Sequence, residues 1–238
     1  KGDPAKRRHA LVEVKTYVDI LRPFIVKYEQ VKQMREQQYA GKRVMNSAVK
    51  RYLLYGEQRM FRGFRVDEKE EFENVHVSVL IDSSASMKHE GRLKTACLAA
   101  TTLAGCLCEC TSIESAFFGY NQNLYCCGSH DEHAVNSLEP VGKTNEAGAL
   151  EVIRQRFGGL AQGLKLVIVL TDGLPTNCSV EAVRSQVDRM SRREGFSFIC
   201  GMLSSEKHPA YSTRIALQSG LNRATVTEFG RTIAKHLA

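Results

Sequence analysis

Five oxygen-bearing side chains lie in three short polar segments, each at the end of a predicted strand or just before a predicted helix. An Asp-x-Ser-x-Ser segment follows the first apolar strand, a Gly-Lys-Thr-Asn segment precedes a helix, and a Thr-Asp-Gly segment follows the most apolar strand. The candidate ligands in these segments are Asp82, Ser84, Ser86, Thr144 and Asp172. Two carboxylates and three hydroxyls are hard oxygen donors, a set that suits Mg²⁺, with Mn²⁺ or Ca²⁺ as substitutes. The sequence therefore predicts a magnesium site.

The elements that must position these side chains begin at residue 75, where strand and helix patterns start to alternate. The predicted strands cover residues 75–81, 113–118, 124–127, 166–170, 196–203 and 224–229, and the predicted helices cover residues 93–110, 147–157, 180–193, 212–218 and 232–237. Such alternation implies right-handed crossovers and helices on both faces of the sheet. We therefore predict an α/β fold with a doubly wound, mainly parallel six-stranded sheet. Ligands of such sheets bind outside the carboxyl ends of the strands, where the polar segments lie.

Residues 1–74 are predicted to form a helical extension with a short edge strand, and residues 75–238 to form one domain. Apolar residues recur at helical spacing near the N-terminus. They are Leu11, Val14, Val18, Leu21, Ile25 and Tyr28. Pro23 lies inside this pattern and should kink or split the helix. A second helix is predicted over 43–55 and the edge strand over 60–66. We expect the apolar stripe to pack on the C-terminal domain.

The basic character of the chain is concentrated in the predicted extension. The formal net charge is +7, and residues 1–74 hold 17 Lys and Arg against 11 Asp and Glu. A basic helical arm can bind nucleic acid or an acidic partner, although it is more often a solvated face. Because no aromatic residues are interleaved with a basic stripe, nucleic-acid binding is kept only as an alternative.

Composition also bears on the cellular compartment. The longest apolar run is five residues, whereas a transmembrane helix needs about 20, so no membrane span is expected. The eight cysteines include no Cys-x-x-Cys pair and are interpreted as reduced thiols of a cytoplasmic protein. The chain starts without an initiator Met or an apolar signal core, and we expect it to be a fragment of a longer protein.

The three polar segments resemble the metal-ion-dependent adhesion site of von Willebrand factor A domains, in the same order along the chain. The resemblance implies that Ser84 and Ser86 coordinate the ion directly and that Thr144 joins them in the ligand-bound form. It implies that Asp82 and Asp172 act mostly through water. It further implies a protein-binding role without catalysis, in which an Asp or Glu of a partner takes the remaining position on the ion. Mg²⁺ takes six ligands and keeps waters, so one water is exchangeable for such a carboxylate.

The upstream segment narrows this resemblance. A Gly-Lys-Arg-Val sequence before a helix, followed by Gly-Glu-Gln-Arg-Met-Phe-Arg over residues 56–62, is similar to CobT-like cobalt-chelatase accessory subunits and NorD-like nitric-oxide-reductase activation proteins. The similarity implies an AAA+ ATPase of the MoxR/chelatase group as partner, and a client protein that offers Asp or Glu to the metal. Two alternatives stay open: a subunit of a cobaltochelatase-type metal-insertion complex, and a nucleic-acid-associated A domain that uses the basic N-terminal helices.

Two other segments match functional motifs only in part. Residues 142–144 match the end of a P-loop, but Ser137 stands where the first glycine would be and no apolar strand precedes it. ATP binding by this chain is therefore not expected. The run His130-Asp131-Glu132-His133 could hold a metal if helical, but its polar flanks favour a solvated loop. No Gly-x-Ser-x-Gly elbow occurs, so a serine hydrolase is not expected either.

Overall fold

A six-stranded sheet forms the centre of the computed structural model, which describes residues 4–25, 75–111, 113–159 and 163–237. The strands, in spatial order, are β3 (Leu124–Gly128), β2 (Ile113–Tyr120), β1 (Val75–Asp82), β4 (Leu164–Thr171), β5 (Phe196–Met202) and β6 (Arg214–Ala216). All neighbouring strands are parallel except β3, which pairs antiparallel with β2. The predicted fold class, a mainly parallel six-stranded α/β sheet, is confirmed.

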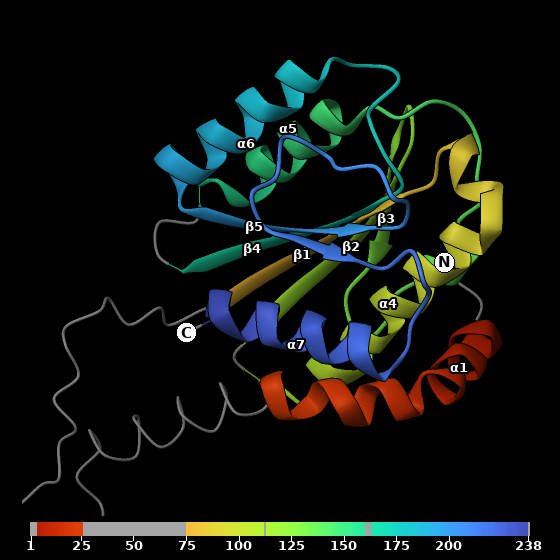
Figure 1. The fold of residues 1–238 in the computed structure, drawn as a ribbon. Coiled ribbons are helices and arrows are strands. Elements are labelled where there is room, and N and C mark those ends of the chain that lie inside the picture. The colour runs from red at the N-terminus through yellow and green to blue at the C-terminus, as the bar shows by residue number, and fades with distance from the viewer. Residues whose placement is uncertain (1–3, 26–74, 112, 160–162, 238) are drawn as a thin grey trace, which may run out of the picture.

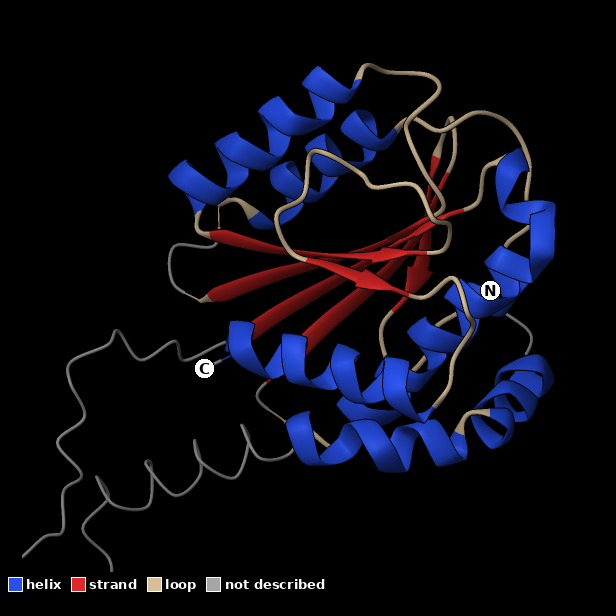
Figure 2. Ribbon diagram, in the orientation of Figure 1, coloured by secondary structure: helices blue, strands red, loops and turns tan. Residues whose placement is uncertain are grey.

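Helices cover both faces of this sheet, as Figures 1 and 2 show. One face carries α5 (Glu146–Phe157) and α6 (Val180–Glu194). The other face carries α4 (Arg92–Leu107) and α7 (Arg223–Leu237). Because both faces are covered, successive residues of a central strand enter opposite cores. The strand sequences are therefore continuous apolar runs rather than alternating patterns.

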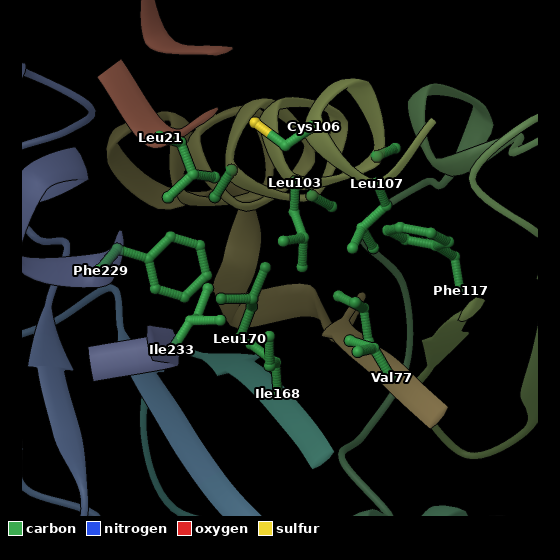
Figure 3. Packing of buried hydrophobic residues seen from close by; sticks show 14 of the residues in the cluster. Leu21, Val77, Leu103, Cys106, Leu107, Phe117, Ile168, Leu170, Phe229 and Ile233 are labelled. Atoms are coloured by element: carbon green, nitrogen blue, oxygen red, sulfur yellow. The ribbon is translucent and has the colours of Figure 1, made fainter. Parts of the chain in front are cut away.

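The larger core lies between the sheet and the layer that contains α4 and α7 (Figure 3). Figure 3 labels Leu21, Val77, Leu103, Cys106, Leu107, Phe117, Ile168, Leu170, Phe229 and Ile233. Helix α4 is buried on nearly all sides, as its Ala-, Leu- and Cys-rich sequence indicates. The sheet covers one of its sides and the N-terminal helices cover the other.

The N-terminal helices extend the helical layer beyond α4 and α7. Helix α1 (Pro4–Glu13) ends one residue before a turn at Val14, and residues 15–25 are again helical. The predicted apolar stripe is largely confirmed: Val14, Val18, Leu21 and Ile25 are buried against the domain, Leu11 is half-buried, and Tyr28 lies outside the described residues. Of the two effects predicted for Pro23, a kink or a split, the split does not occur: the interruption falls at Val14, and the helix continues through Pro23.

Two glycines allow residues 15–25 to approach the domain closely. A Cβ on Gly105 of α4 would lie 2.8 Å from Val18 Cγ2, and a Cβ on Gly230 of α7 would meet the ring of Phe24. At the same interface, Arg22 forms a bidentate ion pair with Glu109, with nitrogen–oxygen distances of 2.8–3.0 Å. The helix 15–25 therefore contacts α4 and α7 at positions where no side chain would fit.

The strand predicted over 224–229 is wrong, because these residues begin α7. Their β-branched side chains favour a strand locally. However, the buried residues Val226, Phe229 and Ile233 recur at helical spacing and face the core. Asn222 caps the helix, since its side-chain oxygen accepts two backbone N–H groups of the first turn, at 2.9 and 3.1 Å. Tertiary burial and a cap thus override the local strand preference.

The sixth strand is instead β6, which lies within residues 212–218, predicted as a helix. It pairs in parallel with β5 from Cys200–Arg214 to Met202–Ala216. Only the middle of its three residues is buried. A strand of this length is too short to show a period-two pattern, which explains the wrong prediction.

The second predicted helix (43–55) and the predicted edge strand (60–66) lie outside the described residues, as does the predicted domain boundary at residue 74. No helix among the described residues is long and apolar enough to span a membrane.

Candidate metal centre

Three loops meet at the carboxyl edge of the sheet, beyond β1 and β4. The loop after β1 is tied to the loop before α5, because Ala85 N–H donates to the carbonyl of Gly142 at 3.0 Å and Val141 N–H donates to Ser83 at 2.9 Å. The loop before α5 is in turn tied to the loop after β4 through Thr144. All three polar segments found in the sequence therefore lie together in space.

Asp82 is the last residue of β1 and is 1% exposed. Its Oδ1 accepts the backbone N–H of Ser84 at 2.8 Å, and its Oδ2 accepts the hydroxyl of Thr171 at 2.9 Å. Burial raises the pKa of Asp82 to about 6, and the nearby carboxylate of Asp172 also raises it. The two contacts leave Asp82 without a cationic partner of its own among the described residues.

The serine hydroxyls connect this aspartate loop to Asp172, the residue after β4. Ser84 Oγ and Ser86 Oγ lie 3.0 Å apart, and the Ser86 hydroxyl donates to Asp172 Oδ1 at 3.0 Å. Asp172 is 8% exposed, whereas Ser86 is exposed to solvent. Four of the five predicted ligands thus form one hydrogen-bonded group that opens to solvent at Ser86.

Thr144, the fifth predicted ligand, is buried in the loop before α5. Its backbone N–H donates to Thr176 Oγ1 at 2.9 Å, and its carbonyl accepts the N–H groups of Thr176 and Asn177 at 3.2 and 2.9 Å. Helix α5 begins directly after it, capped by Asn145, whose side-chain oxygen accepts an N–H of the first turn at 3.2 Å. These contacts fix the backbone of Thr144 against the loop after β4.

A fully buried carboxylate anchors the same loop from inside the domain. Glu146, the first residue of α5, accepts the hydroxyls of Tyr120 (3.4 Å) and Tyr211. Its Oε2 also lies 3.3 Å from His208 Nε2. Burial and the charge of Glu146 raise the pKa of both tyrosines well above their ordinary value, so both hydroxyls keep their protons and act as donors. The start of α5 is therefore fixed to β2 and to the loop between β5 and β6.

The donor set fits a hard divalent cation. Two buried carboxylates lie in one group with hydroxyl oxygens, and the structure pairs Asp82 with N–H and O–H donors and with no cationic side chain among the described residues. No cluster of three or more His, Cys, Asp or Glu side chains that could hold a metal occurs in the described part of the chain. A site for a softer transition metal built from sulfur and imidazole is thus not present among these residues, and an oxygen site of two carboxylates with hydroxyls remains.

Three residues around this group are not among the predicted ligands. Arg92, the first residue of α4, donates from Nη1 to Asp172 Oδ2 at 3.0 Å. Thr171 holds Asp82, as described above, and Glu206 comes from the loop after β5, where its Oε2 lies 3.0 Å from the position of a Cβ on Gly173. Thr171 belongs to the Thr-Asp-Gly segment noted in the sequence, and Arg92 leaves a second kind of signal. A basic residue in the first turn of a helix is opposed by the helix dipole, which indicates an acidic partner elsewhere.

The prediction that residues 130–133 form a solvated loop is wrong for His133, which is 2% exposed and packs against Phe117 with ring centroids 5.6 Å apart. Burial lowers the pKa of His133 to about 4, with a further contribution from the charge of Arg7. His130 is half-buried and its Nδ1 lies 2.7 Å from Ser115 Oγ, which also accepts the backbone N–H of His130. Ser115 therefore anchors the loop.

The cysteines agree with the interpretation as thiols. No disulfide joins cysteines within the described residues, and Cys97, Cys106, Cys110, Cys127 and Cys200 are buried. Burial raises the pKa of Cys97 and Cys106 to about 12, so these thiols stay protonated and unreactive.

The fold is that of a von Willebrand factor A domain. It is similar to a von Willebrand factor type A structure from Catenulispora acidiphila, with a TM-score of 0.51, 17% identity, and coverage of 69% of this chain and 43% of that one. It is also similar to the PilB minor pilin of Streptococcus sanguinis, with a TM-score of 0.53, 13% identity, and coverage of 73% and 63%. The pilus adhesin SpaC from Lactobacillus rhamnosus GG matches with a TM-score of 0.56, 10% identity, and coverage of 71% and 31%.

At these identities the similarity shows the fold alone. This chain spans less than two thirds of the length of each of the three proteins. No protein-family model matches the sequence, and no curated protein does so.

Proposed function

We propose that this chain is a Mg²⁺-dependent protein-binding module that takes an Asp or Glu side chain of its partner at the carboxyl edge of the sheet. The observation that carries the proposal is the run of hydrogen bonds from Asp82 through Ser84 and Ser86 to Asp172. These hydrogen bonds link two buried carboxylates and two serines in one group, and Ser86 is its solvent-exposed member. Mn²⁺ or Ca²⁺ would substitute for Mg²⁺ through the same oxygen donors.

The bound ion would supply a positive centre that attracts and orients a carboxylate. Ser84 and Ser86 would offer hydroxyl oxygens to it, and Thr144 would add a third when the partner is bound. Asp82 and Asp172 would balance its charge, mostly through water. Since two aspartates formally neutralise a divalent ion, a third carboxylate from outside would complete the site without a large excess of negative charge. No hydrogen bond joins a described histidine to Ser84 or Ser86, as a Ser–His catalytic pair would require, so we propose a binding role and no catalysis.

The partner is proposed to be an AAA+ ATPase of the MoxR/chelatase group, together with a client protein that supplies the carboxylate. The proposal follows from the resemblance to CobT-like and NorD-like proteins that was inferred from the sequence pattern of residues 41–62 alone. The fold agrees with a binding role, since the structurally similar SpaC is a pilus adhesin. The buried, protonated thiols agree with action in the cytoplasm, as proposed from the cysteine pattern.

Two alternatives rest on the same chain. In the first, the chain would be a subunit of a cobaltochelatase-type complex, and the metal-insertion activity would belong to the whole assembly. A role in nucleic-acid binding would use the basic residues of the N-terminal third, where most of the +7 net charge lies.

A capture experiment from the native host, with the full chain as bait, tests the proposal. Wild type is compared in Mg²⁺ and in EDTA with Ser86→Ala, which removes the hydroxyl that links the two loops. The matched control is Ser185→Ala, an exposed serine on α6. We expect an ATPase to be retained by wild type and S185A in Mg²⁺, and to be lost with EDTA or S86A. Capture that ignores both EDTA and S86A would overturn the proposal. Nucleic acid that survives EDTA but leaves with salt would support the basic-arm alternative.

A further inference from the structure

Arg92 places a positive charge beside the candidate metal centre. Its Nη1 lies 3.0 Å from Asp172 Oδ2, and its Nη2 lies 3.2 Å from Glu90 Oε2. The side chain is 22% exposed, and its Nε is buried without a hydrogen-bond partner among the described residues. The guanidinium is therefore held against one oxygen of Asp172 while the other oxygen of Asp172 faces Ser86.

The turn before α4 directs Arg92 toward Asp172. Glu90 has φ +52° and Gly91 has φ +66°, so two successive residues adopt the left-handed conformation before the helix starts at Arg92. For Glu90 this conformation is unfavourable. The helix dipole also opposes a cation at the N-terminus of α4, and the first turn contains no acidic residue that would offset this effect. The strained backbone of Glu90 and the unfavourable helix dipole thus both occur where the guanidinium of Arg92 contacts Asp172.

The electrostatic consequence follows from the charges at the site. Asp82 and Asp172 together carry two negative charges, and the positive charge of Arg92, which Glu90 also contacts, offsets part of this charge. A unit positive charge about 6 Å from a divalent ion opposes its binding by roughly tenfold, even at the dielectric constant of water. The guanidinium also occupies Asp172 Oδ2, which is then not available as a second oxygen for the ion.

We propose that Arg92 is a specificity-determining residue that weakens the intrinsic affinity of the site for divalent cations, so that tight binding requires the partner's carboxylate. The inference rests on the proposed function, because it concerns the same cation site. A site whose negative charge is partly offset by Arg92 binds Mg²⁺ more weakly, and the partner's carboxylate restores negative charge to it. Arg92 thereby couples ion binding to partner binding, and this coupling acts in both directions.

Lys94 provides a matched control in the same turn of α4. It carries the same charge, but its side chain is 73% exposed and its Nζ lies 3.4 Å from Glu13, away from Asp172. Loss of Lys94 changes the net charge of the protein as much as loss of Arg92 does. A difference between the two variants therefore reports the position of the charge and not its amount.

The test is titration of the full chain with Mn²⁺ alone, followed by electron paramagnetic resonance of the unbound ion. We expect Arg92→Gln to bind Mn²⁺ roughly tenfold more tightly than wild type. We expect Arg92→Lys to stay within about threefold, and Lys94→Gln within about twofold, of wild type. Arg92→Met, which keeps the buried stem, replaces R92Q if the latter does not fold. Melting curves in EDTA verify that each variant is folded.

The outcomes separate this inference from the proposed function. If wild type binds Mn²⁺, and S86A abolishes that binding, but R92Q and R92M bind no more tightly than wild type, the inference about Arg92 is wrong and the cation site stands. If K94Q tightens binding as much as R92Q does, net charge explains the effect and the inference is again wrong. If no variant binds Mn²⁺, or if S86A leaves binding unchanged, the cation site and the role of Arg92 are both overturned.

Discussion

At the scale of single residues, Asp82 links the candidate site to the stability of the protein. In the absence of a cation its pKa is about 6, above the value of an aspartate in an unfolded chain. The folded protein then binds more protons than the unfolded chain between about pH 4 and pH 6, so stability falls as pH rises through this range. At neutral pH the ionised carboxylate of Asp82 lowers the free energy of unfolding by up to about 3 kcal/mol.

We therefore predict that Asp82→Asn stabilises the protein in EDTA at pH 7.5 and has little effect at pH 4.5. With Mg²⁺ the order reverses, because wild type gains about 2.7 kcal/mol when the ion is at a hundredfold excess over its Kd. Asp82→Ala should abolish Mg²⁺-dependent partner binding and should leave the ion-free fold at least as stable. Melting curves in EDTA and in millimolar Mg²⁺ measure these differences. Unfolding of either variant in EDTA, where wild type stays folded, would mean that Asp82 is a structural cap of its loop.

His133 should make the protein sensitive to acid. In the folded protein the pKa of His133 is about 4, below that of an exposed histidine. The contribution of neutral, buried His133 to the free energy of unfolding is therefore complete above about pH 6.5 and is lost as pH falls toward 4. The loss amounts to at most about 3 kcal/mol. Urea denaturation at pH 7 and pH 5 should show a smaller pH dependence for His133→Leu than for wild type. Equal pH dependence of the two proteins would show that His133 is already accessible to protons in the folded state.

The site residues illustrate what a sequence can and cannot predict at this scale. Asp82, Ser84 and Ser86 could be proposed together because their spacing within one loop brings them together whatever the rest of the fold does. Arg92 could not, since its contact with Asp172 joins residues 80 positions apart and depends on the turn that starts α4.

At the scale of elements, the contact between helix 15–25 and α4 can be tested by whether Gly105→Ala stabilises or destabilises the protein. Gly105→Ala would improve helix propensity by about 1 kcal/mol if nothing else changed. Its Cβ would lie 2.8 Å from Val18, so we expect a net destabilisation of about 1–3 kcal/mol instead. The double variant Val18→Ala/Gly105→Ala should lose less than the sum of the single variants, because the smaller residue makes room. Denaturant unfolding measures all three, and a stabilised G105A would show that residues 15–25 do not pack there.

The elements also show why some predictions were confirmed and others were wrong. Strands β1 and β4 lie in the middle of a sheet with both faces covered, so their sequences are continuous apolar runs. Helix α7 buries one face only, and its first turns contain several β-branched residues, which favour a strand locally. Its helical conformation therefore depends on the packing of that face against the core. β6 owes its conformation to pairing with β5, a contact that no local pattern encodes.

At the scale of the whole molecule, the N-terminal helices are part of the fold of the described chain. Removal of residues 1–40 would uncover the surface on which Val14, Val18, Leu21 and Ile25 are buried. Burial of each such side chain is worth roughly 1.5–3 kcal/mol, so we predict a lower melting temperature and self-association. Size-exclusion chromatography with light scattering detects the association. A truncated protein that stays monomeric with an unchanged melting temperature would show that these helices form an independent arm.

The two outer strands of the sheet restrict how another chain can add to it. β6 has three residues and β3 has five, and the carbonyl of Cys127 in β3 already accepts the N–H of Ala134 at 2.7 Å. Long unpaired strands are the places where foreign strands add and where sheets stack into aggregates. The described sheet offers only short stretches of this kind, so its borders are protected against strand addition. Under the proposed function, a partner would therefore be recruited by side chains at the ends of the strands, through charge and shape and not through main-chain pairing.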